Sequence, residues 1–354
     1  MKKKVAIAMS GGVDSSVTAA LLKKKGYDVI GIMLDLWSDT QSSQNACCTQ
    51  QSHIDARKIA EQINIPFYLI ECKELFKAVV IKDFIDTYSK FMTPNPCIIC
   101  NQIIKFGKLL DEAKIKGADY LATGHYVNLL KENSIFHILK GIDPLKDQSY
   151  FLYRLNQNQL SKLMFPLGRH KKSEIREIAS QLNIHVANKP ESQDICFIGN
   201  NGYREFLNAT STRQNVAGPI MTSDGKILGE HRGLRNYTVG QRRGLAVSYQ
   251  EPLYVLALDP ERTALIVGTN KEREKRSLMA SLLNFTNGLF PDSPFKTEVK
   301  VRYSAKATPA KAYPIDEDKV RLEFDYPILD ITPGQSAVFY QENRLIGGGI
   351  ILFS

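Results

Sequence analysis

Two cysteines stand three residues apart, Cys97 and Cys100, in the stretch TPNPCIICNQ. This spacing suits a metal site, a redox disulfide or a nucleophilic thiolate, and the spacing alone does not choose among the three. We expect a helix to begin near Asn101, which would place Cys100 beside the unpaired amides of the first turn and favour its thiolate. A third cysteine, Cys196, follows much later in the motif SQDICFI.

A second group of chemically capable residues forms the octet MSGGVDSS, Met9 to Ser16. It follows a short apolar run, VAIAM, which is typical of a buried parallel strand, and it precedes a helical stretch. The glycines allow a ligand close to the backbone, while the serine hydroxyls and helix amides offer donors to a phosphate. The chain has no G-x-x-x-x-G-K-[ST] motif, so this is not a Walker A loop. Asp14 would repel a phosphate unless Mg²⁺ bridged the two, so we predict a site for phosphate and Mg²⁺, the alternative being a plain turn rich in glycine and serine.

Strands and helices alternate through the first half of the chain. Apolar runs predict strands over 5–9, 27–34, 66–72 and 118–126, separated by helices over 14–26, 52–64, 74–92 and 101–117. Repeated strand–helix units fold as a doubly wound parallel sheet with helices on both faces, which makes the fold class α/β. Ligands bind such sheets beyond the carboxyl ends of the strands, where the octet and the cysteine motifs can meet.

The pattern changes near Gly199. From there, turn-rich segments such as SDGK and PLYVLALDPERTALIVG predict hairpins, with one short helix at YREFL. Short alternating strands from about Ser277 onward predict a C-terminal β-barrel. We therefore predict three domains: a catalytic α/β domain over 1–200, a small β-rich central domain over 201–276 and a barrel domain over 277–354.

The composition limits the class of protein and its partners. The 354 residues are 43% hydrophobic and 23% charged, the profile of a soluble globular protein. No segment approaches the ~18 apolar residues of a membrane span, and the N-terminal apolar run is too short for a signal peptide, so we expect a cytoplasmic protein with reduced cysteines. The formal net charge is +9, and the cluster RGLRNYTVGQRRG, Arg232 to Gly244, suits a polyanionic partner, with a basic solvated surface as the alternative.

The stretch SGGVDSS resembles the PP-loop of ATP pyrophosphatases, which have an adenine nucleotide α-hydrolase-like fold. Together with TPNPCIICNQIIKFGKLL, ATGHY, KDQSYFLY and ESQDICFI, it makes the chain similar to the bacterial tRNA-specific 2-thiouridylases from Met9 to the C-terminus. The resemblance implies a sulfurtransferase that uses ATP and Mg²⁺ to adenylate the C2 oxygen of the wobble uridine in tRNAs of the Lys, Glu and Gln type. It also implies sulfur transfer from a cysteine persulfide, supplied by a cysteine desulfurase or a relay carrier, with no membrane or DNA partner.

The resemblance further implies roles for individual residues. Cys100 matches the nucleophile and Cys196 the persulfide carrier, so a Cys100–Cys196 disulfide is implied after each turnover. The positions that match the ATP site are Ala8, Met9, Ser10, Gly11, Gly12, Val13, Asp14, Ser15, Met33 and Gly124. Those that match tRNA contacts are Asn95, Pro96, Cys97, His125, Lys146, Asp147, Gln148, Arg302, Tyr303 and Gln335.

Cys97 departs from the family pattern, in which Asn-Pro is followed by Asp. Three thiolates at Cys97, Cys100 and Cys196 would fit a [4Fe-4S] cluster with one open iron, or a zinc ion; otherwise Cys97 is a spare thiol and the persulfide route is unchanged. Two further hypotheses are another PP-loop enzyme, such as an amide synthetase, and a non-enzymatic protein that binds tRNA or sulfur. Cys47 and Cys48 stand in a polar stretch, which we interpret as an ordinary loop in preference to an active-site lid.

Overall fold

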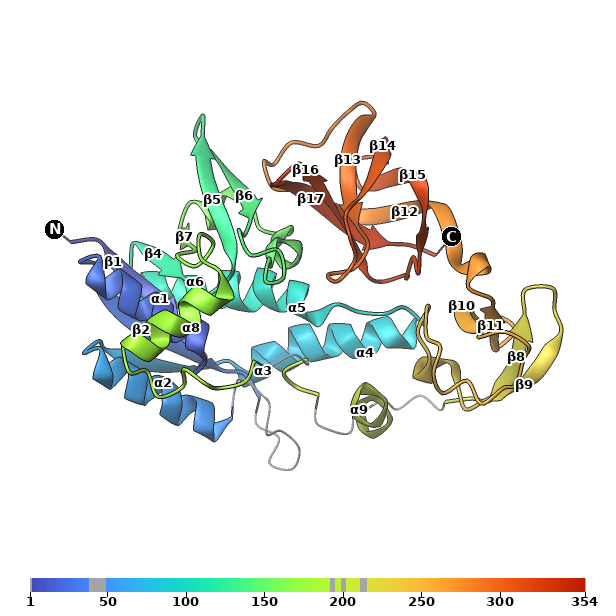
Figure 1. Ribbon diagram of the computed structural model, residues 1–354, viewed down its shortest axis with the longest axis horizontal. Coiled ribbons are helices and arrows are strands. Elements are labelled where there is room, and N and C mark those ends of the chain that lie inside the picture. Colours follow the sequence, from blue (N-terminus) through green and yellow to red (C-terminus); the bar gives the residue numbers. More distant parts are fainter. Residues whose placement is uncertain (1, 38–48, 192–194, 199–201, 211–214, 354) are drawn as a thin grey trace.

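The computed structural model describes residues 2–37, 49–191, 195–198, 202–210 and 215–353. Figure 1 shows a helix-covered parallel sheet at the N-terminal end, a β-barrel beside it, and a small separate sheet at the far end of the molecule. Among the described residues, no helix has the length and apolar character needed to cross a membrane.

A five-stranded parallel sheet forms the centre of the N-terminal unit, in the order β3-β2-β1-β4-β7. Its strands are β1 (Lys4–Ala8), β2 (Asp28–Asp35), β3 (Phe67–Glu71), β4 (Tyr120–Ala122) and β7 (Leu163–Met164). The central strand β1 is apolar throughout its middle and fully buried there, as the continuous apolar run predicts. The predicted α/β fold class is therefore confirmed.

Helices cover both faces of this sheet, because side chains along β1 alternate between two hydrophobic clusters. Val5 and Ile7 pack in the cluster of one face, and Ala6 packs in the cluster of the other. The first face carries α1 (Val13–Lys24), α2 (Gln50–Gln62) and α8 (Lys172–Gln181). The second carries α3 (Lys73–Phe76), α4 (Lys82–Ser89), α5 (Pro96–Ile99) and α6 (Leu109–Ile115).

Two of these helices are longer than their labels suggest, because π-helical stretches join them. The stretch η1 (Lys77–Ile81) links α3 to α4, and η2 (Cys100–Lys108) links α5 to α6. The second helix begins at Pro96, so the prediction of a start near Asn101 is wrong. Proline is favoured at a first helical position because it lacks the N–H that would have no partner there. Cys100 consequently lies beyond the first turn, and Cys97 lies within it.

A β-hairpin joins the N-terminal unit to the barrel. Its strands are β5 (Val127–Glu132) and β6 (Ile135–Lys140), and β6 pairs with β17 (Arg344–Ile351) through Ile138 and Leu139. The chain then continues through η3 (Ser149–Leu152) and α7 (Gln157–Leu160) to β7. The hairpin was not predicted, although β5 and β6 pair with each other across a turn at Asn133 and Ser134. The pairing of β6 with β17 lies beyond any local pattern, since β17 is about two hundred residues further along the chain.

The central unit is small and rich in β-structure, as predicted. The helix α9 (Gly202–Thr210) precedes a sheet of order β10-β11-β8-β9, made of β8 (Gly218–Thr222), β9 (Ile227–His231), β10 (Tyr254–Asp259) and β11 (Ala264–Gly268), with short 3-10 turns η4 (Leu234–Asn236) and η5 (Lys271–Arg273). Tyr88 at the end of α4 stacks on Tyr203 of α9, and Phe91 packs against the core of this unit. The long helix made of α3, η1 and α4 therefore connects the N-terminal unit to the central unit, as Figure 1 shows.

The C-terminal strands close into a barrel, which confirms that prediction. In sheet order they are β12 (Glu274–Phe285), β15 (Lys319–Leu329), β14 (Thr308–Asp316), β13 (Phe295–Lys300), β16 (Ser336–Gln341) and β17, and pairing of β12 with β17 closes the ring. Phe285, Phe295 and Phe339 fill its interior with edge-to-face and tilted contacts.

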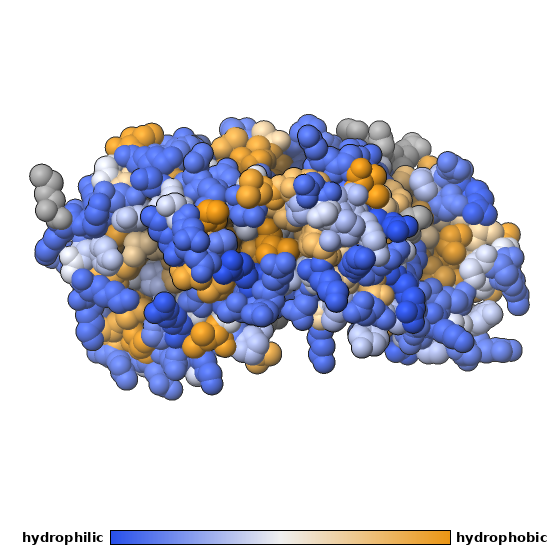
Figure 2. Space-filling view, turned by 90° about the horizontal axis from the view of Figure 1, so that it is seen from above, coloured by the Kyte–Doolittle hydropathy of each residue, from blue (hydrophilic) through white to orange (hydrophobic). Residues whose placement is uncertain are grey.

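Figure 2 shows that the face of the whole molecule seen from above is mostly hydrophilic, with separate hydrophobic patches.

Candidate active site

A cavity of about 220 Å³ lies near the carboxyl ends of β1, β2 and β4. This is where open parallel sheets bind ligands. Most of the residues predicted to hold ATP line it: Ala8, Met9, Ser10, Asp14, Ser15, Met33 and Gly124. The other three predicted residues, Gly11, Gly12 and Val13, form the turn into α1.

The same cavity also reaches residues predicted to contact tRNA. His125 and Gln148 are part of its wall, and so are Lys105 and Leu109 from the helix that begins at Pro96. Residues predicted to bind ATP and residues predicted to contact tRNA, from distant parts of the chain, thus line the same cavity. Lys105 brings a cationic side chain to this space that the sequence analysis did not single out.

The turn before α1 depends on glycine. Gly11 has a φ of +66°, and a Cβ atom there would collide with the carbonyl oxygen of Ser52. A Cβ on Gly124 would lie 2.9 Å from the Asp14 Cβ, so the turn after β4 can approach α1 only without a side chain. Ser10 and Ser15 join their hydroxyls at 3.2 Å at the entrance of the helix.

Asp14, in the first turn of α1, is held by two residues that the sequence analysis missed. The Tyr126 hydroxyl donates to Asp14 Oδ1 at 2.7 Å, and Lys172 Nζ lies 2.7 and 2.8 Å from its two oxygens. Burial, followed by the Asp14 charge, raises the pKa of Tyr126, which keeps the phenol protonated as a donor. Tyr126 ends the motif ATGHY and could have been suspected, whereas nothing near Lys172 in the sequence marks it.

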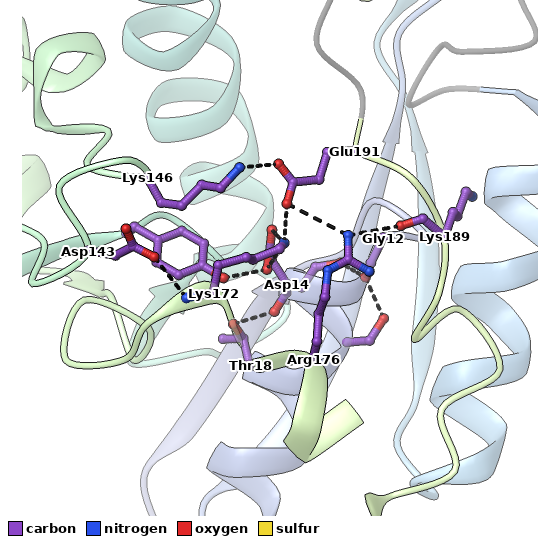
Figure 3. Close-up of polar contacts among 12 residues, drawn as sticks. Gly12, Asp14, Thr18, Asp143, Lys146, Lys172, Arg176, Lys189 and Glu191 are labelled. Atoms are coloured by element: carbon purple, nitrogen blue, oxygen red, sulfur yellow. Dashed lines mark hydrogen bonds and ion pairs between the residues drawn. The ribbon is translucent and has the colours of Figure 1, made fainter. Parts of the chain in front are cut away.

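Glu191 links three cations around Asp14 (Figure 3). Its carboxylate lies 2.6 Å from Lys146 Nζ, 3.1 Å from Lys172 Nζ and 3.8 Å from Arg176 Nη2. Burial works against ionisation, but hydrogen bonds from Lys146 and Lys172 hold the pKa of Glu191 below its ordinary value. A neighbouring pair joins Lys189 to Asp55 at 2.8 Å.

His125 is a buried, uncharged side chain. Its Nδ1 lies 2.8 Å from the Thr123 hydroxyl, and its ring packs near Phe106 and Phe165. Burial, helped by the nearby charge of Lys105, lowers its pKa to about 3. The imidazole can therefore border a ligand as a neutral group and does not supply a cation to phosphate.

The three cysteines of the predicted site differ in exposure. Cys97 is exposed in the first helical turn, Cys100 is buried, and Cys196 is partly buried. Cys100 belongs to the hydrophobic cluster beneath the sheet, and Cys196 packs against the same cluster. Cys72 is buried, and burial raises its pKa. Cys47 and Cys48 lie outside the described residues.

The hypothesis of a [4Fe-4S] cluster is not favoured. Within the part of the chain that the structure describes, no group of three or more His, Cys, Asp or Glu side chains is arranged to hold a metal ion. Cys97, Cys100 and Cys196 therefore do not form the converging thiolate set that a cluster requires. The same geometry does not fit a tetrahedral zinc site on these residues.

The motif KDQ holds the wall of the cavity together. Asp147 is buried and accepts hydrogen bonds from the amides of Gly141 and Ser149 and from the Ser149 hydroxyl. Gln148 accepts from the Tyr126 amide at 3.0 Å. Lys146 is the residue of this motif whose charged group pairs with Glu191, the carboxylate next to Asp14.

Of the predicted tRNA contacts on the barrel, Gln335 binds the loop that leads to Pro96. Gln335 Nε2 donates to the carbonyl oxygens of Thr93 and Pro94, the two residues before Asn95. Tyr303 packs on Phe151 with a ring separation of 4.6 Å.

Arg302, the third predicted contact on the barrel, pairs with the buried Asp330 at 2.9 Å. Arg273 pairs with the same carboxylate. Although burial acts in the other direction, hydrogen bonds from these two arginines lower the pKa of Asp330.

The basic cluster in the central unit is mostly exposed. Arg232, Arg242 and Arg243 face solvent, whereas Arg235 is buried. The exposed arginines are thus available to phosphate groups, and Arg235 belongs to the interior of the unit.

Comparison with known proteins accounts for nearly the whole chain. Family models match residues 3–200 as a tRNA methyl transferase HUP domain, residues 204–269 as a tRNA methyl transferase PRC-barrel domain and residues 275–351 as an aminomethyltransferase beta-barrel domain. The fold of the U34-tRNA thiolase NcsA from Methanococcus maripaludis with its [4Fe-4S] cluster is only distantly similar, with a TM-score of 0.34 and 22% identity over 59% of this chain and 65% of that one.

Curated relatives are much closer. The chain is 41% identical to a tRNA-specific 2-thiouridylase MnmA of Acetivibrio thermocellus over 99% of both proteins. It is 44% identical to the protein of that name from Halothermothrix orenii over 98% of both. The match covers all three units of the structure at once. The chain belongs to the MnmA family of tRNA-specific 2-thiouridylases.

Proposed function

We propose that this protein is an ATP-dependent tRNA-uridine 2-sulfurtransferase, which converts the wobble uridine of tRNAs of the Lys, Glu and Gln type to 2-thiouridine in the cytoplasm. The observation that carries the proposal is the shared cavity, whose wall contains both the PP-loop residues and His125 and Gln148. A site that joins a nucleotide to a base needs these two sets of residues around one space. The full-length similarity to the family supports the same activity.

The first step activates the base. ATP lies along Ala8–Ser15, with its adenosine near Met33 and Gly124. The C2 oxygen of uridine attacks the α-phosphate and pyrophosphate leaves, so that the poor oxygen leaving group at C2 becomes AMP. Asp14 and the neighbouring serine hydroxyls offer the oxygen ligands that Mg²⁺ prefers, and the bound ion would offset the charge of the phosphates.

The second step transfers sulfur. The terminal sulfur of a Cys196 persulfide attacks C2, and AMP leaves. The Cys100 thiolate then attacks the Cys196 sulfur, which breaks the bond to the transferred sulfur and forms a Cys100–Cys196 disulfide. A thiol reductant must reduce this disulfide before the next turnover. Release of the sulfur as free sulfide before it attacks C2 is the alternative route.

Two partners follow from this chemistry. The first is tRNA, whose wobble base is unpaired and can turn out into the cavity, with contacts from Asn95, Pro96, Cys97, His125, Lys146, Asp147, Gln148, Arg302, Tyr303 and Gln335. The second is a persulfide donor, a cysteine desulfurase or a relay carrier. We also propose that the functional domains are 1–200 for catalysis, 201–276 for tRNA binding and 277–354 for the barrel.

The test is the 2-thiouridine content of unmodified tRNA after incubation with the protein, ATP, Mg²⁺ and a persulfide donor, measured by mass spectrometry. We expect product from the wild type, and none from Cys100→Ser or Cys196→Ser. Cys72→Ala, which removes a buried thiol outside the proposed reaction, serves as the matched control and should retain activity. Pyrophosphate release that needs no tRNA would instead indicate an amide synthetase, and absence of both products would indicate a non-enzymatic binding protein.

A further inference from the structure

Lys172 is a buried ammonium group placed directly against the PP-loop. It is the first residue of α8, yet its side chain is only 10% exposed, whereas the preceding residue, Lys171, is exposed. Its Nζ lies between Asp14, at 2.7 and 2.8 Å, and Glu191, at 3.1 Å. Figure 3 shows the lysine extending from the start of α8 to the start of α1.

The two carboxylates that hold Lys172 are themselves accessible. Asp14 and Glu191 are 32% and 30% exposed, so a ligand can reach this junction. Lys146 and Arg176 also contact Glu191, which gathers three cationic side chains around one carboxylate. Asp143 accepts hydrogen bonds from the backbone amides of Lys172 and Leu145.

The positions of these groups match the needs of a polyanion. Asp14 is in the first turn of α1, where the amides of the helix and the PP-loop would receive phosphate oxygens. The ammonium group of Lys172, held on the Asp14 carboxylate, would lie next to those phosphate oxygens. Side chains from α8 and from the KDQ motif thereby extend the phosphate site beyond the PP-loop.

We propose that Lys172, supported by Lys146 and Arg176, binds the pyrophosphate end of the nucleotide, and that Glu191 holds these cations in place when no phosphate is bound. This inference rests on the proposed function, in which ATP is cleaved to AMP and pyrophosphate. When the phosphates arrive, the ammonium group of Lys172 exchanges its carboxylate partners for phosphate oxygens. Glu191 is then a positioning residue that competes with pyrophosphate for the three cations.

A purely structural role makes a different prediction. If Lys172 only ties α8 to α1, its loss should weaken the binding of every ligand at the PP-loop, together with thermal stability. If it contacts the pyrophosphate end, its loss should affect pyrophosphate and not AMP, because AMP lacks the β- and γ-phosphates. Separate measurement of the two ligands therefore distinguishes the roles.

The experiment is calorimetric titration of the full chain, without tRNA, by pyrophosphate and by AMP in the presence of Mg²⁺. We expect Lys172→Met, which keeps the length of the stem, to weaken pyrophosphate binding by roughly 10- to 100-fold, the usual value of one or two charged hydrogen bonds. AMP binding should stay near the wild-type value. Lys172→Arg should restore most of the affinity, and Glu191→Gln should increase it. Lys171→Met, the exposed neighbour, should change neither ligand.

Wild-type affinity for pyrophosphate in Lys172→Met would overturn the inference, and so would an equal loss of AMP binding. If Lys172→Met does not fold, Glu191→Gln decides alone, and unchanged pyrophosphate affinity in that variant would count against the inference. A wild-type protein that binds neither pyrophosphate nor AMP would overturn the proposed function itself, which is a separate and recognisable result.

Discussion

His125 and Lys172 show how a single residue acquires its properties from neighbours that are remote in the sequence. The motif ATGHY indicates a histidine after a strand, but its neutral state follows from burial among Phe106 and Phe165 and from the charge of Lys105. The octet MSGGVDSS predicts a phosphate turn and an acidic residue within it. Lys172, which pairs with Asp14, stands 158 residues later in the chain, and no local pattern indicates it.

His125 should make the protein less stable in mild acid. Its pKa is about 3 in the folded protein and 6.5 in an unfolded chain, so below pH 6.5 the unfolded state binds a proton that the folded state does not. The stabilising contribution is complete above about pH 6.5 and is lost progressively as the pH falls toward 3. Between pH 7 and pH 5 we expect a loss of about 2 kcal/mol in the free energy of unfolding from this residue.

Urea unfolding at several pH values measures this effect. The free energy of unfolding should fall less steeply between pH 7 and pH 5 in His125→Asn than in the wild type. The slope is compared, since the substitution also changes packing. Identical slopes in the two proteins would mean that His125 takes up a proton in the folded state.

Gly11 should tolerate no side chain. In Gly11→Ala the alanine would have to adopt a left-handed backbone conformation, and its methyl group would collide with the Ser52 carbonyl. Gly26, with a φ of +86° and no atom within 4 Å of its would-be Cβ, is the matched control for the conformational part alone. We expect Gly26→Ala to cost about 1 kcal/mol of stability, and Gly11→Ala to cost more and to abolish ATP binding. Equal costs in urea unfolding with intact ATP binding would contradict the tight approach of the PP-loop to α2.

At the level of secondary structure, apolar periodicity predicted the main elements and local chemistry shifted their ends. The strands and helices of the parallel sheet follow from runs such as VAIAM, because buried parallel strands are apolar on both faces. The start of the helix at Pro96 was not predicted, because a proline is read as a helix terminator unless it stands at the first helical position, as Pro96 does. The hairpin of β5 and β6 is local and was not predicted, whereas its pairing with β17 is encoded by no local pattern.

The corrected helix start predicts which thiol reacts first. Cys97 is exposed in the first turn, whereas Cys100 is 8% exposed and packs in the hydrophobic cluster. In the protein without ligands, iodoacetamide should therefore modify Cys97 faster than Cys100, by roughly tenfold or more, since exposure and the helix N-terminus both favour thiolate reactivity. Peptide mapping after timed alkylation gives the two rates.

Cys97→Ser provides the functional counterpart of that measurement. If Cys97 is a spare thiol beside the base, this variant should retain most of the 2-thiouridine formation, and alkylation of the variant should now report Cys100 alone. Faster labelling of Cys100 than of Cys97 in the wild type would show that the buried position is open in solution.

In the whole molecule, the three units converge on the loop between α4 and α5. Gln335 of the barrel donates to the carbonyls of Thr93 and Pro94, and Phe91 of the same loop packs on the central unit. One short segment next to Pro96 thus contacts both β-rich units. The molecule is elongated and carries a formal charge of +9, and the face seen in Figure 2 is mostly hydrophilic, so basic side chains can be exposed at a distance from the cavity.

The exposed arginines of the central unit should set the salt dependence of tRNA binding. Each phosphate contact releases counterions, so a variant that loses contacts has a shallower slope of log affinity against log salt. We expect strongly salt-dependent binding in the wild type between ~50 and ~300 mM salt, and a slope lower by up to about 1 for each contacting arginine removed in Arg242→Ala and Arg243→Ala. Arg262→Ala is the matched control, because Arg262 is exposed in the same unit but pairs with Asp259. Fluorescence anisotropy with labelled tRNA gives the slopes. If the variant with both Arg242→Ala and Arg243→Ala keeps the wild-type slope and affinity, the tRNA backbone does not contact the central unit at these arginines. Other basic residues of the chain would then contact the tRNA phosphates.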